Sequence, residues 1–229
     1  MEGSRTSILV VHGFNHDHHQ MRPLAEFLAS RFESDVSVHG IDLYPADGRS
    51  SLVTLADQVV SSLRQLVLGR IEEERSRDAN FRLDEEAPLP SSVRVHLVGF
   101  SMGGLVSRIA FQQRGGASFT KSVISIASPH AGTVMAYLKQ APGVRDMRPT
   151  SGQIRSLHGS LEECVRADGM TTFTQLWTPF DHLIVPATNG RLPVGTNRLV
   201  PVIGHNRLIA HPACFQAVFE AIQAREAQG

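Results

Sequence analysis

Short apolar runs alternate along the chain with longer segments in which apolar residues recur at helical spacing. The apolar runs predict buried strands at residues 7–11, 36–43, 93–98, 122–127, 173–177 and 197–203. Spacing of i, i+3, i+4 and i+7 predicts helices at residues 21–32, 52–67, 105–110 and 212–222. Strands that alternate with helices predict an α/β fold in which helices cover both faces of a mostly parallel sheet of about six strands.

Two stretches fit this alternation less well. Residues 70–92 mix both charges densely and end in prolines, which predicts the end of a helix followed by a solvated loop. A regulatory or partner-binding insertion is the alternative interpretation. Residues 133–169 show weak periodicity, so we expect a less regular segment that covers the site. We expect residues 1–229 to form one domain, because no linker-like change in composition divides the chain.

Composition narrows the class of protein further. Among 229 residues, 41% are hydrophobic, and 22 basic residues balance 22 acidic ones. This balance argues against nucleic acid or an anionic membrane as the main partner. No apolar run approaches the roughly 18 residues of a membrane span, and the first residues lack a signal peptide, so we expect a cytoplasmic protein, or a secreted one if a leader has been removed. Cys164 and Cys214 form neither a metal motif nor a disulfide framework.

The most informative motif is Gly99-Phe100-Ser101-Met102-Gly103-Gly104, which follows a predicted strand and precedes a predicted helix. A serine in the pattern G-x-S-x-G at a strand-to-helix turn is typical of a nucleophile elbow. The flanking glycines fit because such a turn crowds the backbone. Ser101 is therefore the candidate nucleophile.

A serine nucleophile needs a base, and the base needs an acid that orients it. In this type of fold the acid and then the histidine follow the serine in the chain. The acids in that interval are Asp146, Glu162, Glu163, Asp168 and Asp181, and the late histidines are His182, His205 and His211. We assign Asp181 as the acid and His205 as the base, because each follows a predicted strand end.

Attack on an ester carbonyl creates an oxyanion that backbone N–H groups can stabilise. One donor is expected to be Met102, at the positive end of the helix after Ser101. The loop after the first strand, His12-Gly13-Phe14, lets the backbone approach closely, so Phe14 is the expected second donor.

Together, five motifs make the chain resemble the α/β-hydrolase lipases, particularly small bacterial triacylglycerol lipases and esterases. The motifs are residues 12–14, 99–104, 128–133, 180–186 and 204–205. The resemblance implies a three-layer α/β-hydrolase fold and cofactor-independent hydrolysis of a small-molecule ester or lipid. It also implies a Ser101, His205 and Asp181 triad with an acyl-enzyme intermediate. Three alternatives stay open: an acyltransferase, a glycolipid-anchor deacylase that uses the same triad, and a non-catalytic binding module.

Other polar residues near these loops are expected to be structural. The cluster at residues 16–19, His-Asp-His-His, has no usual zinc spacing, and we expect Asp17 or His18 to cap the first helix. His12 and His130 are expected to shape their loops, and Asp42 to anchor its own. Apolar residues at 135–138 and 183–185 either contact an acyl chain or pack in the core.

Overall fold

Six parallel strands form the central sheet of the computed structural model, which describes residues 6–32, 36–84 and 87–228. The strand order is β2-β1-β3-β4-β5-β6. The strands are β1 (Thr6–Val11), β2 (Val36–Ile41), β3 (Val95–Phe100), β4 (Thr120–Ile126), β5 (Thr172–Trp177) and β6 (Thr196–Leu199). The prediction of a mostly parallel sheet of about six strands is confirmed, since every pairing is parallel.

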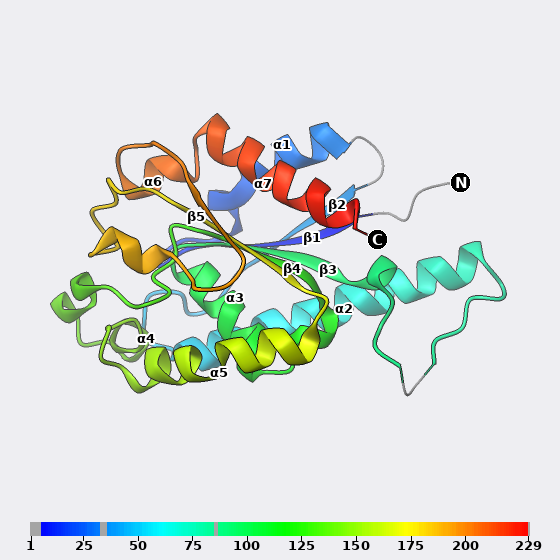
Figure 1. Ribbon diagram of the computed structural model, residues 1–229, viewed down its shortest axis with the longest axis horizontal. Coiled ribbons are helices and arrows are strands. Elements are labelled where there is room, and N and C mark those ends of the chain that lie inside the picture. The colour runs from blue at the N-terminus through cyan, green and yellow to red at the C-terminus, as the bar shows by residue number, and fades with distance from the viewer. Residues whose placement is uncertain (1–5, 33–35, 85–86, 229) are drawn as a thin grey trace.

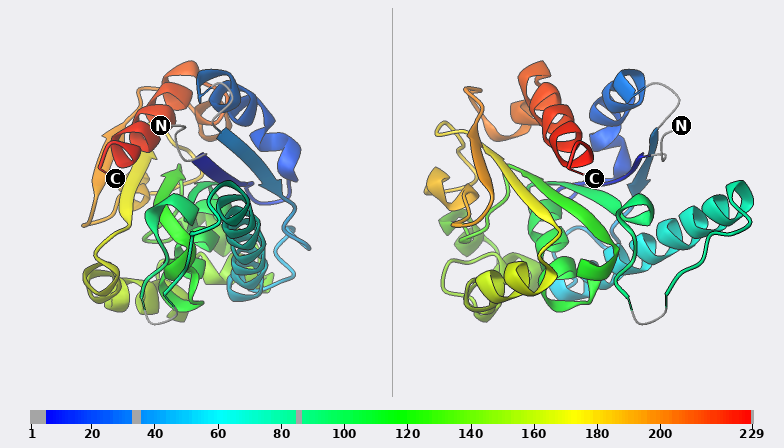
Figure 2. Two further views of the ribbon diagram at one scale, coloured as in Figure 1. Left: turned by 90° about the vertical axis from the view of Figure 1, so that its right-hand side faces the viewer. Right: turned by 45° about the vertical axis from the view of Figure 1, so that its right-hand side comes forward.

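Helices cover both faces of this sheet, as Figures 1 and 2 show. Helices α1 (Arg22–Phe32) and α7 (Pro212–Glu226) lie on one face, and α2 (Leu52–Arg77), α3 (Met102–Gln113) and α5 (Gly152–Asp168) lie on the other. Because side chains alternate along a strand, Ile8 and Val10 pack in the core under α1 and α7, whereas Leu9 and Val11 pack against α2 and α3. Burial of both faces explains why the last four residues of β1, from Ile8 to Val11, are all apolar.

Shorter elements connect these layers. They are the helices α4 (Pro142–Asp146) and α6 (His205–Leu208) and the 3₁₀ helices η1 (His18–Met21), η3 (Ser91–Val93), η4 (Gly116–Phe119), η5 (Val134–Leu138) and η6 (Ala187–Gly190). Within the described ranges, no helix has both the length and the apolar character needed to cross a bilayer.

The expectation of a less regular segment at 133–169 is wrong for its second half, which forms the 17-residue helix α5. Ser151 caps this helix by accepting the N–H of Ile154, and Gly169 ends it at φ 62°. Leu157 and Leu161 are buried with Ile154 along one stripe. Apolar residues at 154, 157, 161 and 165 do recur at helical spacing, but the glycines at 152 and 159 lower the helix propensity, so burial of this stripe stabilises the helix.

Helix α2 extends to Arg77 and so takes in the first part of the charged segment 70–92. Arg70 is buried there and forms ion pairs with Glu73 at 2.6 Å and Glu74 at 3.2 Å. A loop over residues 78–84 follows, as predicted, while residues 85 and 86 lie outside the described residues.

The strand predicted at residues 197–203 is shorter than expected, since β6 ends at Leu199. Pro201 has no backbone N–H for a ladder, and the N–H of Val202 turns back to the carbonyl of Val200. Beyond Val200 the chain therefore leaves the sheet and continues to Gly204 and His205.

The position of a site follows from the strand order. The chain adds β2 on one side of β1 and then β3 on the other, so the order reverses between β1 and β3. Loops that leave neighbouring strands in opposite directions open a crevice at the carboxyl ends of those strands. Phe14 follows β1 and Ser101 follows β3, which places both at this switch point.

Candidate active site

Ser101 occupies a sharp turn between β3 and α3. Its backbone has φ 53° and ψ −122°, a conformation that residues other than glycine rarely adopt. Its N–H donates to the carbonyl of Ile126 at 2.8 Å, which ties the turn to β4. The hydroxyl therefore stands at the carboxyl edge of the sheet on a fixed backbone.

The glycines around Ser101 are required by close contacts. A Cβ at Gly99 would lie 2.5 Å from the Cα of Gly104, and one at Gly103 would lie 2.3 Å from the carbonyl oxygen of His12. At Gly104 it would lie 2.0 Å from Ser128 Oγ. The motif thus sets how closely α3 packs against β1 and β4.

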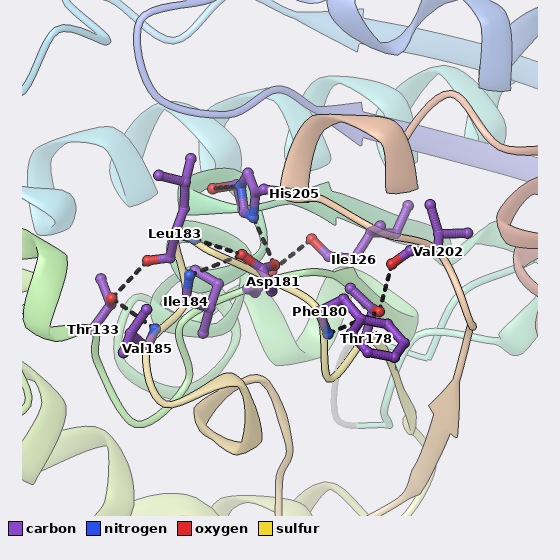
Figure 3. A network of polar contacts seen from close by, with 12 residues as sticks. Ile126, Thr133, Thr178, Phe180, Asp181, Leu183, Ile184, Val185, Val202 and His205 are labelled. Carbon is purple, nitrogen blue, oxygen red and sulfur yellow. Dashed lines mark hydrogen bonds and ion pairs between the residues drawn. The ribbon is translucent and has the colours of Figure 1, made fainter.

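His205 joins Ser101 to Asp181 through two hydrogen bonds. Its Nε2 lies 2.8 Å from Ser101 Oγ, and its Nδ1 lies 2.8 Å from Asp181 Oδ2. Figure 3 shows His205 and Asp181 with the backbone groups around them. Because an ionised carboxylate only accepts, Nδ1 carries the ring proton and Nε2 is free to accept the serine proton. The ring also packs on Phe100, with centroids 5.0 Å apart.

Asp181 is held rigidly in this arrangement. Its Oδ1 accepts the backbone N–H groups of Leu183 at 2.8 Å and Ile184 at 2.9 Å, which leaves Oδ2 for His205 (Figure 3). Burial alone would raise the pKa of Asp181, but the hydrogen bond and charge of His205, with the two backbone N–H groups, lower it below its ordinary value. The carboxylate therefore stays ionised beside His205.

The backbone N–H groups of the two expected oxyanion donors form no hydrogen bond within the part of the chain that the structure describes. The N–H of Gly13 donates to Gln20 Oε1 and that of Asn15 donates to the carbonyl of Ala46. Between them, the N–H of Phe14 donates to no described residue, and the same holds for the N–H of Met102. Met102 is the first residue of α3, where the helix dipole adds positive potential.

The other polar residues singled out from the sequence have structural partners. Leu43 N–H donates to His12 Nε2 at 2.9 Å, so His12 Nδ1 donates to the carbonyl of Gly13 at 2.8 Å. Asp42 accepts both the N–H and Nδ1 of His18. His211 caps α7 by accepting the N–H of Ala213, whereas His182 is exposed.

The cap expected at residues 16–19 is Asp17, which accepts the N–H of His19 at the start of η1. Both cysteines are free.

A hollow of about 240 Å³ opens beside Ser101 and is lined almost entirely by apolar groups; we call it the Ser101 hollow. Its walls are formed by Phe14, Pro129, Thr133, Met135, Ala136, Leu138, Lys139, Val144, Met147, Leu183 and Ile184. The apolar segments at 135–138 and 183–185 therefore do contribute to the site. Thr133 Oγ1 joins these walls, since it donates to the carbonyl of Leu183 at 2.6 Å and accepts the N–H of Val185 at 3.0 Å (Figure 3).

Sequence reasoning missed three wall residues: Lys139, and also Val144 and Met147, which lie in and next to α4. The latter two reach Ser101 because the loop before α2 anchors α4, where Gly143 N–H donates to the carbonyl of Gly48 at 2.9 Å. A Cβ at Gly143 would lie 2.3 Å from the carbonyl oxygen of Ser50. The Pro142-Gly143 pair was the only local signal, and it predicted a turn alone.

Arg108 was also missed, and it supports the loop that carries Pro129. The side chain is fully buried, and it donates to the carbonyls of His130 at 3.0 Å and Leu157 at 2.7 Å. Burial lowers the pKa of Arg108 to about 9. His130 Nε2 lies 2.6 Å from Ser125 Oγ, and burial and the nearby Arg108 hold the pKa of His130 well below its ordinary value.

The sheet order, the elbow and the loops at its carboxyl edge define an α/β-hydrolase fold, and comparisons with solved structures agree. A mature lipase from Bacillus licheniformis is 16% identical, with a TM-score of 0.69 over 98% of this chain and 93% of that one. Lipase B from Aspergillus fumigatus, at 16% identity and a TM-score of 0.72, is covered over 53% of its length by 97% of this chain. A monoacylglycerol lipase from Paleococcus ferrophilus is 15% identical, with a TM-score of 0.56 over 99% and 97% of the two chains.

Sequence comparison gives the family. The pattern of the palmitoyl protein thioesterase family matches residues 7–177, which is most of the chain, so this protein belongs to that family. The match includes Ser101 and ends before Asp181 and His205. No curated protein sequence matches the chain.

Proposed function

We propose that the protein hydrolyses carboxylic esters of apolar acyl chains through an acyl-enzyme formed on Ser101. The observation that carries this proposal is the continuous hydrogen-bonded series Ser101, His205, Asp181 at the mouth of an apolar hollow. A binding module would have no need of this series.

In the first half of the reaction, Ser101 Oγ attacks the carbonyl carbon while His205 Nε2 accepts the hydroxyl proton. Asp181 stabilises the imidazolium through Nδ1. The carbonyl oxygen, now an anion, would accept hydrogen bonds from the backbone N–H groups of Phe14 and Met102. Collapse of the intermediate breaks the bond to the leaving alcohol, which takes the proton from His205.

In the second half, His205 removes a proton from water, and the hydroxide attacks the acyl carbon. The tetrahedral intermediate then collapses, Ser101 Oγ leaves and regains its proton from His205, and the acid departs. No cofactor enters this sequence of steps. Both halves use the same base, since His205 is neutral again once the alcohol has left.

The surroundings of Ser101 favour a lipid-like acyl group. The Ser101 hollow is apolar, and exposed apolar side chains continue from its wall to the surface, with Leu138 75% exposed and Leu183 36% exposed. An acyl chain would bury this surface, at roughly 25 cal/mol per Å² of apolar area.

Family membership favours a second substrate class, acyl thioesters. A thiolate is a better leaving group than an alkoxide, and the same serine, base and donors would serve its release. Both classes yield one acyl-Ser101 intermediate, so they differ only in the first half of the reaction.

Turnover of matched oxygen and sulfur esters tests the proposal. We expect the protein to hydrolyse nitrophenyl butyrate and decanoate and the corresponding acyl thioesters, and Ser101→Ala to abolish all four activities. Formation of a new ester when glycerol is added, with little free acid, would instead indicate an acyltransferase. No turnover of either class, or turnover that survives Ser101→Ala, would overturn the proposal.

A further inference from the structure

A second hollow lies away from Ser101, between α7 and the amino-terminal parts of β5 and β6; we call it the α7 hollow. It has a volume of about 560 Å³ and shares no lining residue with the Ser101 hollow. Ser101 stands at the carboxyl ends of the strands, whereas Thr172 and Thr196, in the wall of the α7 hollow, begin β5 and β6. Figure 1 shows α7 over this part of the sheet.

Small side chains create the α7 hollow. Ala217, Ala221 and Ala224 line it from α7, at spacings of four and three residues that place them on one face of the helix. Thr172 and Thr174 line it from β5, at alternate positions that share one face of the sheet. The methyl groups of these alanines and threonines therefore face one another across the α7 hollow, which larger side chains would have filled.

At one end of this alanine stripe lies a buried cation, Arg225, for which the described residues supply no ion-pair partner. Arg225 lines the α7 hollow and is 6% exposed, yet its Nε has no hydrogen-bond partner. Throughout the described residues, its guanidinium forms no ion pair. A buried charge is costly unless it is paired, so an anion at Arg225 would be stabilising.

The acidic side chains near Arg225 are already engaged. Glu226 pairs with His96 Nε2 and Lys121 Nζ, each at 2.6 Å. Glu220 pairs with Arg198 and accepts Gln216 Nε2 at 2.9 Å. Because Arg198 and Glu220 neutralise each other, the lining of the α7 hollow carries a net positive charge, which is that of Arg225.

We propose that the α7 hollow binds an aliphatic carboxylate, with the carboxylate on Arg225 and the chain along the alanine stripe. A guanidinium can donate two parallel hydrogen bonds to a carboxylate through its two terminal NH₂ groups. The methyl-lined walls match an aliphatic chain, and the volume lies within the roughly 300–1,000 Å³ of small-molecule sites. The site is independent of the reaction proposed at Ser101.

Methyl NMR on protein labelled with ¹³C at alanine methyls tests this site directly, because it distinguishes the two hollows. Sodium decanoate below its micelle concentration is the probe. We expect saturable shifts at Ala217, Ala221 and Ala224 with a Kd below about 1 mM. Ala136, in the wall of the Ser101 hollow, reports separately on any binding there.

Two variants and one control make the assignment specific. Arg225→Gln removes the charge and should weaken decanoate binding about tenfold or more, since hydrogen bonds to charged groups are the strong ones. Ala221→Leu fills the hollow and should abolish the shifts at Ala217 and Ala224. This second variant keeps the site testable if Arg225→Gln does not fold. The control Arg75→Gln makes the same charge change at an exposed position on α2 and should leave the affinity unchanged.

Inorganic phosphate separates an aliphatic-anion site from a plain anion site. We expect phosphate to shift these methyls far more weakly than decanoate, because it has no chain to bury. Equal affinity for phosphate would overturn the proposal. So would an absence of shifts at Ala217, Ala221 and Ala224, or binding that Ala221→Leu leaves unchanged.

Discussion

His205 Nε2 lies 2.8 Å from Ser101 Oγ although the two residues are 104 positions apart in the chain. The sheet brings them together, because Ser101 follows β3 directly and His205 begins the helix that follows β6. Asp181 comes from the loop after β5, and its own contacts with Leu183 and Ile184 aim Oδ2 at His205. The three side chains therefore come from segments that follow three different strands and meet at the carboxyl edge of one sheet.

Replacing Asp181 with asparagine should reduce kcat by about 10⁴-fold with little loss of stability. The amide oxygen can still accept the N–H groups of Leu183 and Ile184, so the loop keeps its conformation. The neutral side chain cannot stabilise the imidazolium, and its NH₂ group favours the wrong tautomer of His205. Rates with nitrophenyl butyrate and thermal unfolding measure the two effects.

The control for this variant is Asp57→Asn, which breaks an exposed ion pair with Arg114 of 2.6 Å. It should change kcat by less than about twofold, because exposed pairs contribute little. A kcat for Asp181→Asn within tenfold of the parent would show that Asp181 does not orient the base.

Two substitutions in the Ser101 hollow should move chain-length preference in opposite directions. Ala136→Leu narrows the hollow and should lower kcat/KM for nitrophenyl decanoate about tenfold while leaving the acetate nearly unchanged. Met147→Ala widens it and should raise the ratio of decanoate to acetate. Equal losses on both substrates would mean that the acyl chain lies elsewhere.

Glu226 should make folding stability depend on acidic pH. Burial would raise the pKa of Glu226, but hydrogen bonds from His96 and Lys121 and their charges lower it from 4.5 to about 2. The unfolded chain thus binds the proton more readily, so the stabilisation is complete above pH 4.5 and is lost as pH falls toward about 2. Glu226→Gln should lower the free energy of unfolding at neutral pH by about 2 to 3 kcal/mol.

Chemical denaturation at a series of pH values measures this effect. The difference between the parent and Glu226→Gln should narrow steadily as pH falls below 4.5. Glu163→Gln, at an exposed position on α5, should change the free energy of unfolding by less than about 0.5 kcal/mol. A difference between parent and Glu226→Gln that stays constant with pH would contradict the lowered pKa of Glu226.

The features that could be predicted from sequence are those with a strong local pattern. Strand β1 is buried on both faces, so its sequence ends in a run of apolar residues. Helix α2 carries a long series of apolar residues at helical spacing. The elbow at Ser101 has a fixed spacing of glycines. The positions of Asp181 and His205 could be inferred because parallel strands bring their carboxyl ends to one edge.

What escaped prediction depends on contacts between distant segments. Val144 reaches the site only because Gly143 packs on the loop before α2, and nothing in its own sequence neighbourhood indicates this. Helix α5 carries two glycines, so its stability comes from burial of Leu157 and Leu161 rather than from propensity. Among the described residues, the lack of a hydrogen-bond partner for Arg225 Nε is likewise visible only in three dimensions.

Covalent labelling of Ser101 tests the central claim most directly. A fluorophosphonate should add once per chain, and mass spectrometry of peptides should place the adduct on Ser101. The adduct should be lost in Ser101→Ala and kept in Ser76→Ala, an exposed serine on α2. Labelling that persists in Ser101→Ala, or no labelling of the folded parent, would contradict Ser101 as the nucleophile.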